Sequence, residues 1–482
     1  MISTRLCIFI FALMLSSKNV LSQEPEHGGR ARLAAMGSGN LVSGAFINPF
    51  VWRDPSWRSL NPSFQSLYKD LAWAELSRAN LVGLSSQQAG YGLSSAGVSK
   101  SIGEQWTIGA EIGYNPTAVN EIAALVTGKQ AFGLPVSSIA QRKTQDFSSN
   151  DFGIGLATTY GASNGSFHLG LGACYWKETP SPRDTMIGSV RLTKQTESRY
   201  LLLRAGGIFD LDENGNYQLE VGAGLGFDNA SDKQSFSVTT ARPFDGEYVA
   251  TGLEISVHAR GKYRLWQELA RTTNLVGLVS VGHIIGDPKE ETKPSGTLGP
   301  TVRSLTASAT GYVVGIGLEM NRQNFPNKSE GDYTFAGGVS CLNSKSEVKF
   351  SRAASGQNPQ SEGIITYSSK PVAIAINAGI EFWPTKWLAA RGGIYYAFGK
   401  REVTIDSTFS NTPVPITRLP QVDTPFLLVG GSNSLAYDGA VGLGFGFVFG
   451  KLRFDATICQ LIGIHDNLST FGFLSLSFYY GR

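Results

Sequence analysis

The sequence predicts an all-β protein, namely a transmembrane antiparallel β-barrel. Three observations lead to this prediction. Many segments alternate between two unlike faces, the segments are long enough to cross a bilayer, and the links between them alternate between short and long. The chain has 482 residues, with 57 glycines and only 16% charged residues. Its length suits one large barrel or about two or three soluble domains.

Large apolar residues alternate with glycine or charged residues over much of the chain. In the stretch 437–460, an apolar row faces a row of glycines up to Gly450, and a second apolar row then faces charged and polar residues. A period of two indicates extended strands with two different faces. The same pattern recurs at 106–114, 152–160, 167–176, 217–228, 253–262, 312–319 and 372–382.

The alternating segments are about 9 to 13 residues long, whereas soluble strands average about 5 to 6 and a strand that crosses a membrane needs about 9 to 11. Aromatic residues often stand at the ends of the apolar rows, as expected where a barrel meets the two interfaces. Such end pairs are Trp106 and Tyr114, Phe152 and Tyr160, and Tyr217 and Phe227.

The links sort by length, as they do in membrane barrels with short periplasmic turns and long outer loops. Short links fall near 103–104, 161–165, 211–216, 265–271, 384–386 and 450–451, and the link near 321–331 is intermediate. Long links fall near 115–149, 178–196, 229–247, 286–303, 345–367 and 401–436. In a soluble β-sandwich, nothing requires the links at one end of the strands to be longer than those at the other end. The apolar rows therefore face lipid, and the sheet must close so that every backbone group is paired.

The expected number of strands is 14, or 16 if the poorly patterned segments 70–80 and 91–101 are also strands. The barrel is assigned to residues 69–482. Residues 1–22 are predicted to be a secretory signal peptide, because Arg5 precedes an apolar core at 6–15 and small residues precede Gln23. The alternative for this segment is a buried N-terminal helix.

Residues 31–66 lack the alternation and contain Met36-Gly37, Gly44-Ala45, Asp54 and Asn61-Pro62. This order resembles the N-terminal motif of the FadL-like outer-membrane family. That family includes long-chain fatty-acid and hydrocarbon uptake channels and the PorV- and PorQ-like proteins of Bacteroidetes secretion systems. Two departures are Ser63, where the family usually has alanine, and the sequence Met36-Gly37-Ser38-Gly39 in place of Met-Gly-Gly-Ala.

The resemblance implies a barrel of about 14 strands in the outer membrane of a Gram-negative bacterium, with residues 23–68 folded inside it as a hatch. A physical reason agrees, because small residues pack closely in a lumen and an Asn-Pro turn sets the entry into the first strand. The motif residues of this hatch are Met36, Gly37, Asp54, Asn61 and Pro62. The alternative is an ordinary periplasmic lead-in peptide.

Charged residues of both signs are expected to face the lumen. They either brace the wall or form a selectivity filter. The inward glycines, such as Gly442, Gly444 and Gly446, leave room for a plug or let the wall bend. The inward charges are Glu111, Glu220, Glu254, Arg260, Lys262, Glu319, Glu381, Arg391, Arg453 and Asp455.

The run 209–220 nearly matches a calcium loop, with Asp210, Asp212 and Asn214 at the first, third and fifth positions. The twelfth position needs a bidentate carboxylate but holds Val221, so this run is interpreted as a hairpin turn at Asn214-Gly215.

Residues 161–165 match GxSxG, but a nucleophile elbow needs a strand followed by a helix, and strands lie on both sides here. The four cysteines are far apart, without a CxxC pair or histidines at metal spacing. We therefore expect no metal, no cofactor and no enzymatic activity. The alternative is an esterase or protease whose residues converge from distant strands.

Two functions fit these observations. The first is a passive uptake channel for hydrophobic small molecules that resemble long-chain fatty acids. The second is a non-catalytic barrel, like PorV or PorQ, that binds exported proteins or a secretion machine. Two outer links carry apolar runs that either gather a ligand or pack together as a lid, and their candidate ligand-binding residues are Ile122, Leu125, Val126, Phe132, Phe426 and Leu427.

The expected partners are outer-membrane lipid and either a hydrophobic small molecule or an exported protein. The net charge of +3 does not suggest nucleic acid. The sequence does not determine the oligomeric state, and a monomer is the working expectation.

Overall fold

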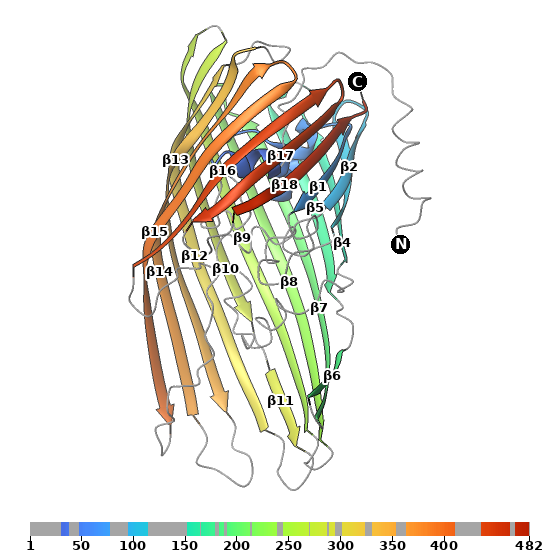
Figure 1. Cartoon of the computed structure of the whole chain (residues 1–482), viewed down its shortest axis with the longest axis vertical. Coiled ribbons are helices and arrows are strands. Elements are labelled where there is room, and N and C mark those ends of the chain that lie inside the picture. The colour runs from blue at the N-terminus through green and yellow to red at the C-terminus, as the bar shows by residue number, and fades with distance from the viewer. Residues whose placement is uncertain are drawn as a thin grey trace.

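The protein is a closed antiparallel β-barrel in the computed structural model (Figure 1), which confirms the predicted all-β class. The structure describes residues 30–37, 48–77, 95–113, 152–163, 165–178, 183–187, 190–212, 215–238, 244–268, 270–286, 289–294, 301–322, 330–352, 363–409, 435–462 and 468–481.

Strands follow one another around the sheet in chain order as antiparallel neighbours, except that β5 pairs past β6 with β7 and β10 pairs past β11 with β12. Their bounds are β1 (Leu71–Ser77), β2 (Ser95–Ile102), β3 (Trp106–Gly113), β4 (Phe152–Gly161), β5 (Phe167–Glu178), β6 (Arg183–Ile187), β7 (Val190–Asp210), β8 (Tyr217–Val238), β9 (Phe244–Glu268), β10 (Arg271–Gly286), β11 (Lys289–Pro294), β12 (Thr301–Arg322), β13 (Asp332–Arg352), β14 (Gly363–Thr385), β15 (Leu388–Phe409), β16 (Leu435–Phe449), β17 (Leu452–Ile462) and β18 (Leu468–Tyr479).

The barrel has 16 strands, so the expected number of 14 is wrong and the alternative of 16 is confirmed for the described chain. Of the 18 segments, β6 continues β5 along β7, and β11 continues β10 between β9 and β12. The pairing of β1 with β18 closes the sheet.

The first strand lacks a clear alternation because it begins with three apolar residues that point to both faces. Leu71, Ala72 and Trp73 are all buried. Trp73 faces the interior, where the guanidinium of Arg58 lies 3.7 Å from the centroid of its ring. A strand covered on both faces loses the alternation that marks a strand exposed to lipid on one side and polar surroundings on the other.

Seven strands, β7 to β9 and β12 to β15, are 21 to 25 residues long, well beyond the expected 9 to 13. They extend far past β16, β17 and β18 on the side of the long links (Figure 1). Much of the expected long links at 229–247 and 345–367 is therefore strand. The backbone pairing continues there, but the sequence turns polar, and the apolar period that indicates a strand stops.

The outward side chains near the short turns form an apolar band. Leu171, Leu156 and Ile316 are each about 60% exposed. Aromatic rings pair beside three of the short turns: Trp106 and Tyr160 meet edge to face, whereas Tyr217–Tyr263 and Trp387–Phe447 are stacked. An exposed apolar band with an aromatic border is the surface of a barrel that sits in a bilayer.

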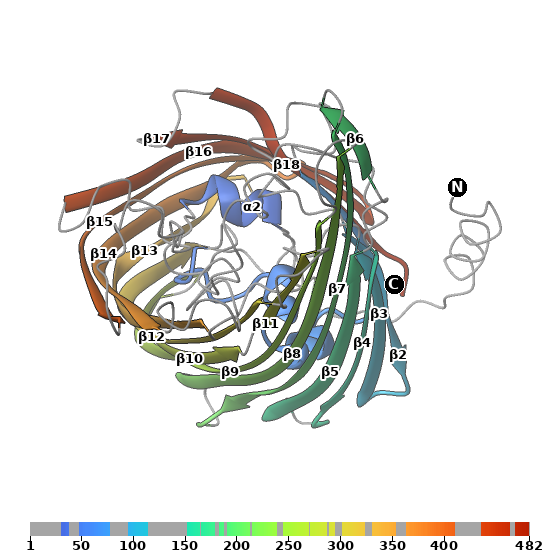
Figure 2. The same ribbon diagram turned by 90° about the horizontal axis from the view of Figure 1, so that it is seen from below.

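The N-terminal segment, residues 30–37 and 48–68, lies inside the ring of strands, where α2 is visible (Figure 2). It contains α2 (Arg30–Ala35) and two short 3-10 helices, η1 (Pro55–Ser59) and η2 (Pro62–Leu67). Its apolar side chains and inward side chains of the wall form one buried cluster. Within the described residues, no helix has the length and hydropathy to cross a bilayer.

Candidate functional site

The backbone of Met36 and Gly37 lies on three glycines of the wall. Gly379, Gly393 and Gly442 are direct neighbours across β14, β15 and β16. A Cβ on Gly379 or Gly393 would overlap the backbone of Met36 or Gly37, and one on Gly442 would crowd Ala34. The inward glycines therefore make room for the N-terminal segment.

Two asparagines hold the same part of the segment. Asn377 Nδ2 donates to the carbonyl of Gly37 at 2.8 Å, and Asn48 Nδ2 donates to the carbonyl of Met36 at 2.7 Å. Gly37 has a φ of +80°, a conformation that favours glycine. Met36 and Gly37 thus contact their neighbours through backbone atoms. The wall residues that face this backbone must therefore be small, as the three glycines are.

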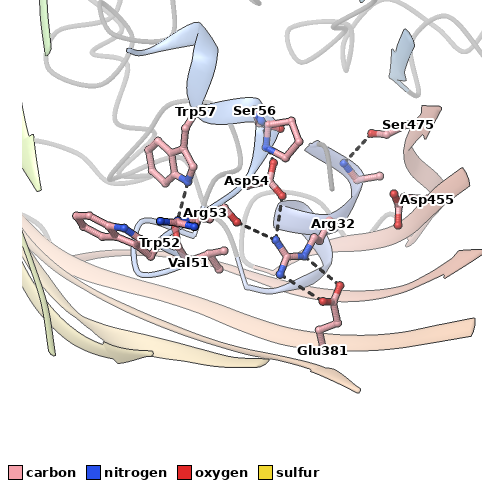
Figure 3. A network of polar contacts seen from close by, with 12 residues as sticks. Arg32, Val51, Trp52, Arg53, Asp54, Ser56, Trp57, Glu381, Asp455 and Ser475 are labelled. Carbon is pink, nitrogen blue, oxygen red and sulfur yellow. Dashed lines mark hydrogen bonds and ion pairs between the residues drawn. The ribbon is translucent and has the colours of Figure 1, made fainter. Parts of the chain in front are cut away.

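Arg32 joins two parts of the segment to the wall (Figure 3). Its guanidinium donates to Asp54 at 3.1 Å and to Glu381 of β14 at 3.0 Å, and all three side chains are fully buried. Asp54 also accepts from the backbone N–H of Ser56, so it caps η1. Burial raises the pKa of Asp54 to about 6 while Arg32 opposes the rise, so the carboxyl keeps its charge at pH 7 and remains paired.

The network continues along the wall through the predicted lumen charges. Arg391 of β15 donates to Glu381 at 2.7 Å and pairs with Asp455 of β17 at 2.7 Å. Arg453 pairs with Asp455 at 2.8 Å and lies 3.7 Å from Glu381. Glu381 is therefore the carboxylate shared by three arginines, one of which belongs to the N-terminal segment.

A second buried network lies on β8 and β9. Arg260 Nε donates to Glu220 at 2.6 Å, and its other nitrogens donate to backbone carbonyls of residues 49, 51 and 52. Its guanidinium lies 3.5 Å from the centroid of the Trp57 ring. This cation–π contact and the carbonyl contacts tie η1 and the chain before it to this side of the barrel.

Asn61 and Pro62 join η2 to the wall. Asn61 caps η2 by accepting from the N–H of Ser63 at 3.0 Å, while its Nδ2 donates to the carbonyl of Val221 at 3.0 Å. Its side chain passes beside Gly206, where a Cβ would block it. Pro62 is the first residue of η2 and packs near Gly172. All five motif residues therefore lie in the N-terminal segment and contact either the wall or another part of the segment.

Replacing Asn61 with alanine is expected to loosen η2 without opening the barrel. The variant loses the helix cap and the side-chain donation to the carbonyl of Val221, a cost of about 1–2 kcal/mol. Hydrogen exchange of residues 61–68 should become faster, while exchange of β13 and β14 stays unchanged. Equal exchange rates at 61–68 in both proteins would contradict this role of Asn61.

Two further predicted lumen charges lie on β9 and β3. Glu254 of β9 accepts from the Tyr200 hydroxyl at 3.0 Å. Glu111 of β3 is part-buried. The six candidate ligand-binding residues of the outer links, at 122–132 and 426–427, lie outside the described residues.

Sequence reasoning missed an apolar strip on the inner wall. Val313 faces Leu342 across β12 and β13, Leu342 faces Ala373, and Ala375 faces Ala397 on β15, and these inward side chains are almost completely buried. The strip lies beyond Phe50 of the segment, whose ring touches Gly317 and Gly338. The signal was the loss of polar residues at inward positions within 372–376. A barrel lumen is usually polar, so this strip is a specific feature.

The two runs that mimic chemical motifs are turns. Asp212 accepts from the N–H of Tyr217 at 2.9 Å and from Asn216 Nδ2 at 2.7 Å, so its carboxylate is used by the turn. The N–H of Ala162 donates to the carbonyl of Phe167 at 2.9 Å between β4 and β5, which lack the helix that a nucleophile elbow requires. Within the described ranges, no group of three or more histidine, cysteine or acidic side chains could hold a metal ion.

A closed sheet, an outer apolar band with aromatic borders and buried charges in the lumen define a transmembrane β-barrel. No family model and no curated protein matches the sequence, so membership of the FadL-like family stays a prediction.

Solved structures with a similar fold are outer-membrane barrels. The ferric citrate transporter FecA is 8% identical with a TM-score of 0.38, and the match covers 81% of this chain and 58% of that one. The toluene transporter TodX of Pseudomonas putida is 11% identical with a TM-score of 0.38, covering 95% and 97%. The translocator domain of the autotransporter NalP from Neisseria meningitidis is 13% identical with a TM-score of 0.26, covering 60% and 84%.

Proposed function

We propose that the protein is an outer-membrane channel of a Gram-negative bacterium for the passive uptake of hydrophobic small molecules that resemble long-chain fatty acids. The observation that supports this proposal is the apolar strip around Val313 and Leu342. An apolar solute gains about 25 cal/mol for each Å² of apolar surface that leaves water. These side chains are covered in the structure, so the strip offers such a solute a path, which a charged lumen does not, once the groups that cover it move aside.

Residues 23–68 act as the hatch in this proposal. Within the described part, the ion pair of Arg32 with Glu381 attaches the segment to β14, and the contacts of Arg260 attach it to β9. While the segment is in place, it limits leakage through the lumen. It must shift before a solute can pass. The inward charges brace the wall and the segment, because they pair with each other and with the segment.

The test compares two double variants with the same chemistry on opposite faces of the wall. Val313→Thr with Leu342→Thr makes the inner strip polar, whereas Val314→Thr with Ile316→Thr makes the equivalent change on the lipid face. We expect uptake of a fluorescent long-chain fatty acid by cells that express the barrel to fall about ten-fold for the inner variant, which corresponds to about 1.4 kcal/mol. The outer variant should retain uptake.

The second candidate is the protein-binding barrel, and one observation favours it. The long strands β7 to β9 and β12 to β15 extend beyond the short ones on the side of the long links (Figure 1), and the sequence of these extensions is mostly polar. Wild-type uptake no higher than that of cells without the barrel, together with a stoichiometric exported protein on the purified barrel, would favour this candidate over the channel.

A further inference from the structure

Three exposed lysines stand at one level on three adjacent strands. On β14 the outward apolar row runs from Phe382 to Val372, and Lys370 is the next outward residue. On β15 the outward row of Ile394, Tyr396 and Phe398 is followed by Lys400. On β13 the outward positions Val339, Cys341 and Asn343 are followed by Lys345. On β14 and β15 the lysine is thus the first outward residue past the end of the apolar row, and on β13 it is the second, after Asn343.

The length of the row shows where these lysines lie relative to a bilayer. Ten residues separate Phe382 from Val372. At about 3.4 Å per residue and a tilt of about 40°, they rise about 26 Å. The apolar band of a membrane barrel is about 25 Å tall. The lysines therefore lie at the interface on the side of the long links, opposite the short turns.

The pairing of the strands brings these lysines together. Val372 of β14 pairs with Lys400 on one side and with Asn343, two residues before Lys345, on the other. Adjacent strands are about 4.8 Å apart, so the three ammonium groups are within reach of one headgroup.

The local charge remains positive after the nearby carboxylates are counted. Glu347 pairs with Lys345 at 3.6 Å and with Lys349 at 2.9 Å, and the position opposite Lys370 in the register is Glu402. The sequence and register of this region thus contain four lysines and two glutamates. Both Lys345 and Lys349 keep more than half of their side-chain surface exposed despite the ion pairs.

The corresponding positions elsewhere show that the cluster is local. The first outward residues past the row are Asn229 on β8, Thr251 on β9 and Thr310 on β12, all uncharged and exposed. Lys177 and Arg199 take this place on β5 and β7, but both already have interactions within the chain. The exposed positive charge is therefore concentrated on β13 to β15.

We propose that Lys345, Lys370 and Lys400 bind the phosphate groups of a phosphorylated lipid in the outer leaflet. Lysine is a flexible point charge whose stem can lie along apolar surface while its ammonium group reaches a headgroup. A basic residue near an anionic membrane surface contributes on the order of 1 kcal/mol to lipid binding. This inference depends on the membrane position of the barrel and is independent of the molecule that the barrel transports.

The test uses the purified full-length barrel and native mass spectrometry. The probes are bisphosphorylated lipid A and the same lipid after chemical removal of its phosphates. We expect the wild type to prefer the phosphorylated lipid, and we expect Lys345→Gln, Lys370→Gln and Lys400→Gln together to weaken its binding by about ten-fold or more. The matched control, Arg271→Gln with Lys386→Gln and Lys451→Gln, removes three exposed positive charges near the short turns and should leave binding unchanged.

A triple Lys→Arg variant at the same three positions should retain binding, which separates loss of charge from loss of folding. Equal binding of both lipids by the wild type would overturn the proposal. So would equal binding by the wild type and the triple glutamine variant, or a loss in the short-turn control as large as that in the cluster.

Discussion

Replacing Glu381 with glutamine is expected to destabilise the N-terminal segment more than any other single change of one polar side chain discussed above. Glu381 lies within 4 Å of three buried arginines, Arg32, Arg391 and Arg453. Glutamine keeps the shape but removes the negative charge, and breaking a buried ion pair costs about 3–5 kcal/mol. Arg391 and Arg453 retain Asp455, and Arg32 retains Asp54.

The measurement is the ion current through single barrels in a planar bilayer, together with the temperature at which the barrel unfolds in detergent. We expect frequent long openings in Glu381→Gln, because the segment is released from β14. The control is Glu347→Gln, which removes a carboxylate from an ion pair with exposed lysines, where the expected cost is below about 1 kcal/mol. A Glu381→Gln barrel with the current of the wild type would show that the segment is held by other contacts.

Adding one methyl group at Gly393 should also displace the segment. The Cβ of Gly393→Ala would overlap the backbone of Met36 and Gly37, and backbone cannot turn aside as a flexible side chain can. Overpacking a tight contact costs about 1–3 kcal/mol. The strand pairing of β15 is kept, because the substitution changes only the inward face of the wall.

The matched control is the next residue, Gly392, where a Cβ would only make ordinary contact with Leu443 on the outer side. Protease cleavage within residues 30–37 should become about ten-fold faster in Gly393→Ala, since about 1.4 kcal/mol corresponds to a factor of ten. Gly392→Ala should be cleaved at the rate of the wild type. If the two variants are cleaved equally, the glycine patch does not hold the segment.

The inward positions of the charges could be predicted from the sequence, but their partners could not. The alternation of side chains within 372–382 and 452–458 places Glu381 and Asp455 on the face opposite the apolar row. The partner of Glu381 in the segment, Arg32, is 349 residues away in the chain. Nothing in a local pattern selects that arginine, because the contact depends on how the closed sheet surrounds the segment.

The inner apolar strip shows a second limit of prediction from the sequence. Val313 stands between Tyr312 and Val314 in an uninterrupted apolar run, where a period of two cannot assign a face. The outer halves of the long strands were missed for a related reason. Their outward positions no longer face lipid, so selection for an apolar row ends although the backbone ladder continues.

By itself, the sequence determined that this protein is a membrane barrel, which residues of the well-patterned strands face lipid, and where most of the short turns lie. These properties are local, because each depends on a period of two and on turn residues a few positions apart. The tertiary structure decided the number of strands, the place of the N-terminal segment on Gly379, Gly393 and Gly442, and the ion pairs of Glu381. Those depend on closure of the sheet, which brings together residues that are hundreds of positions apart.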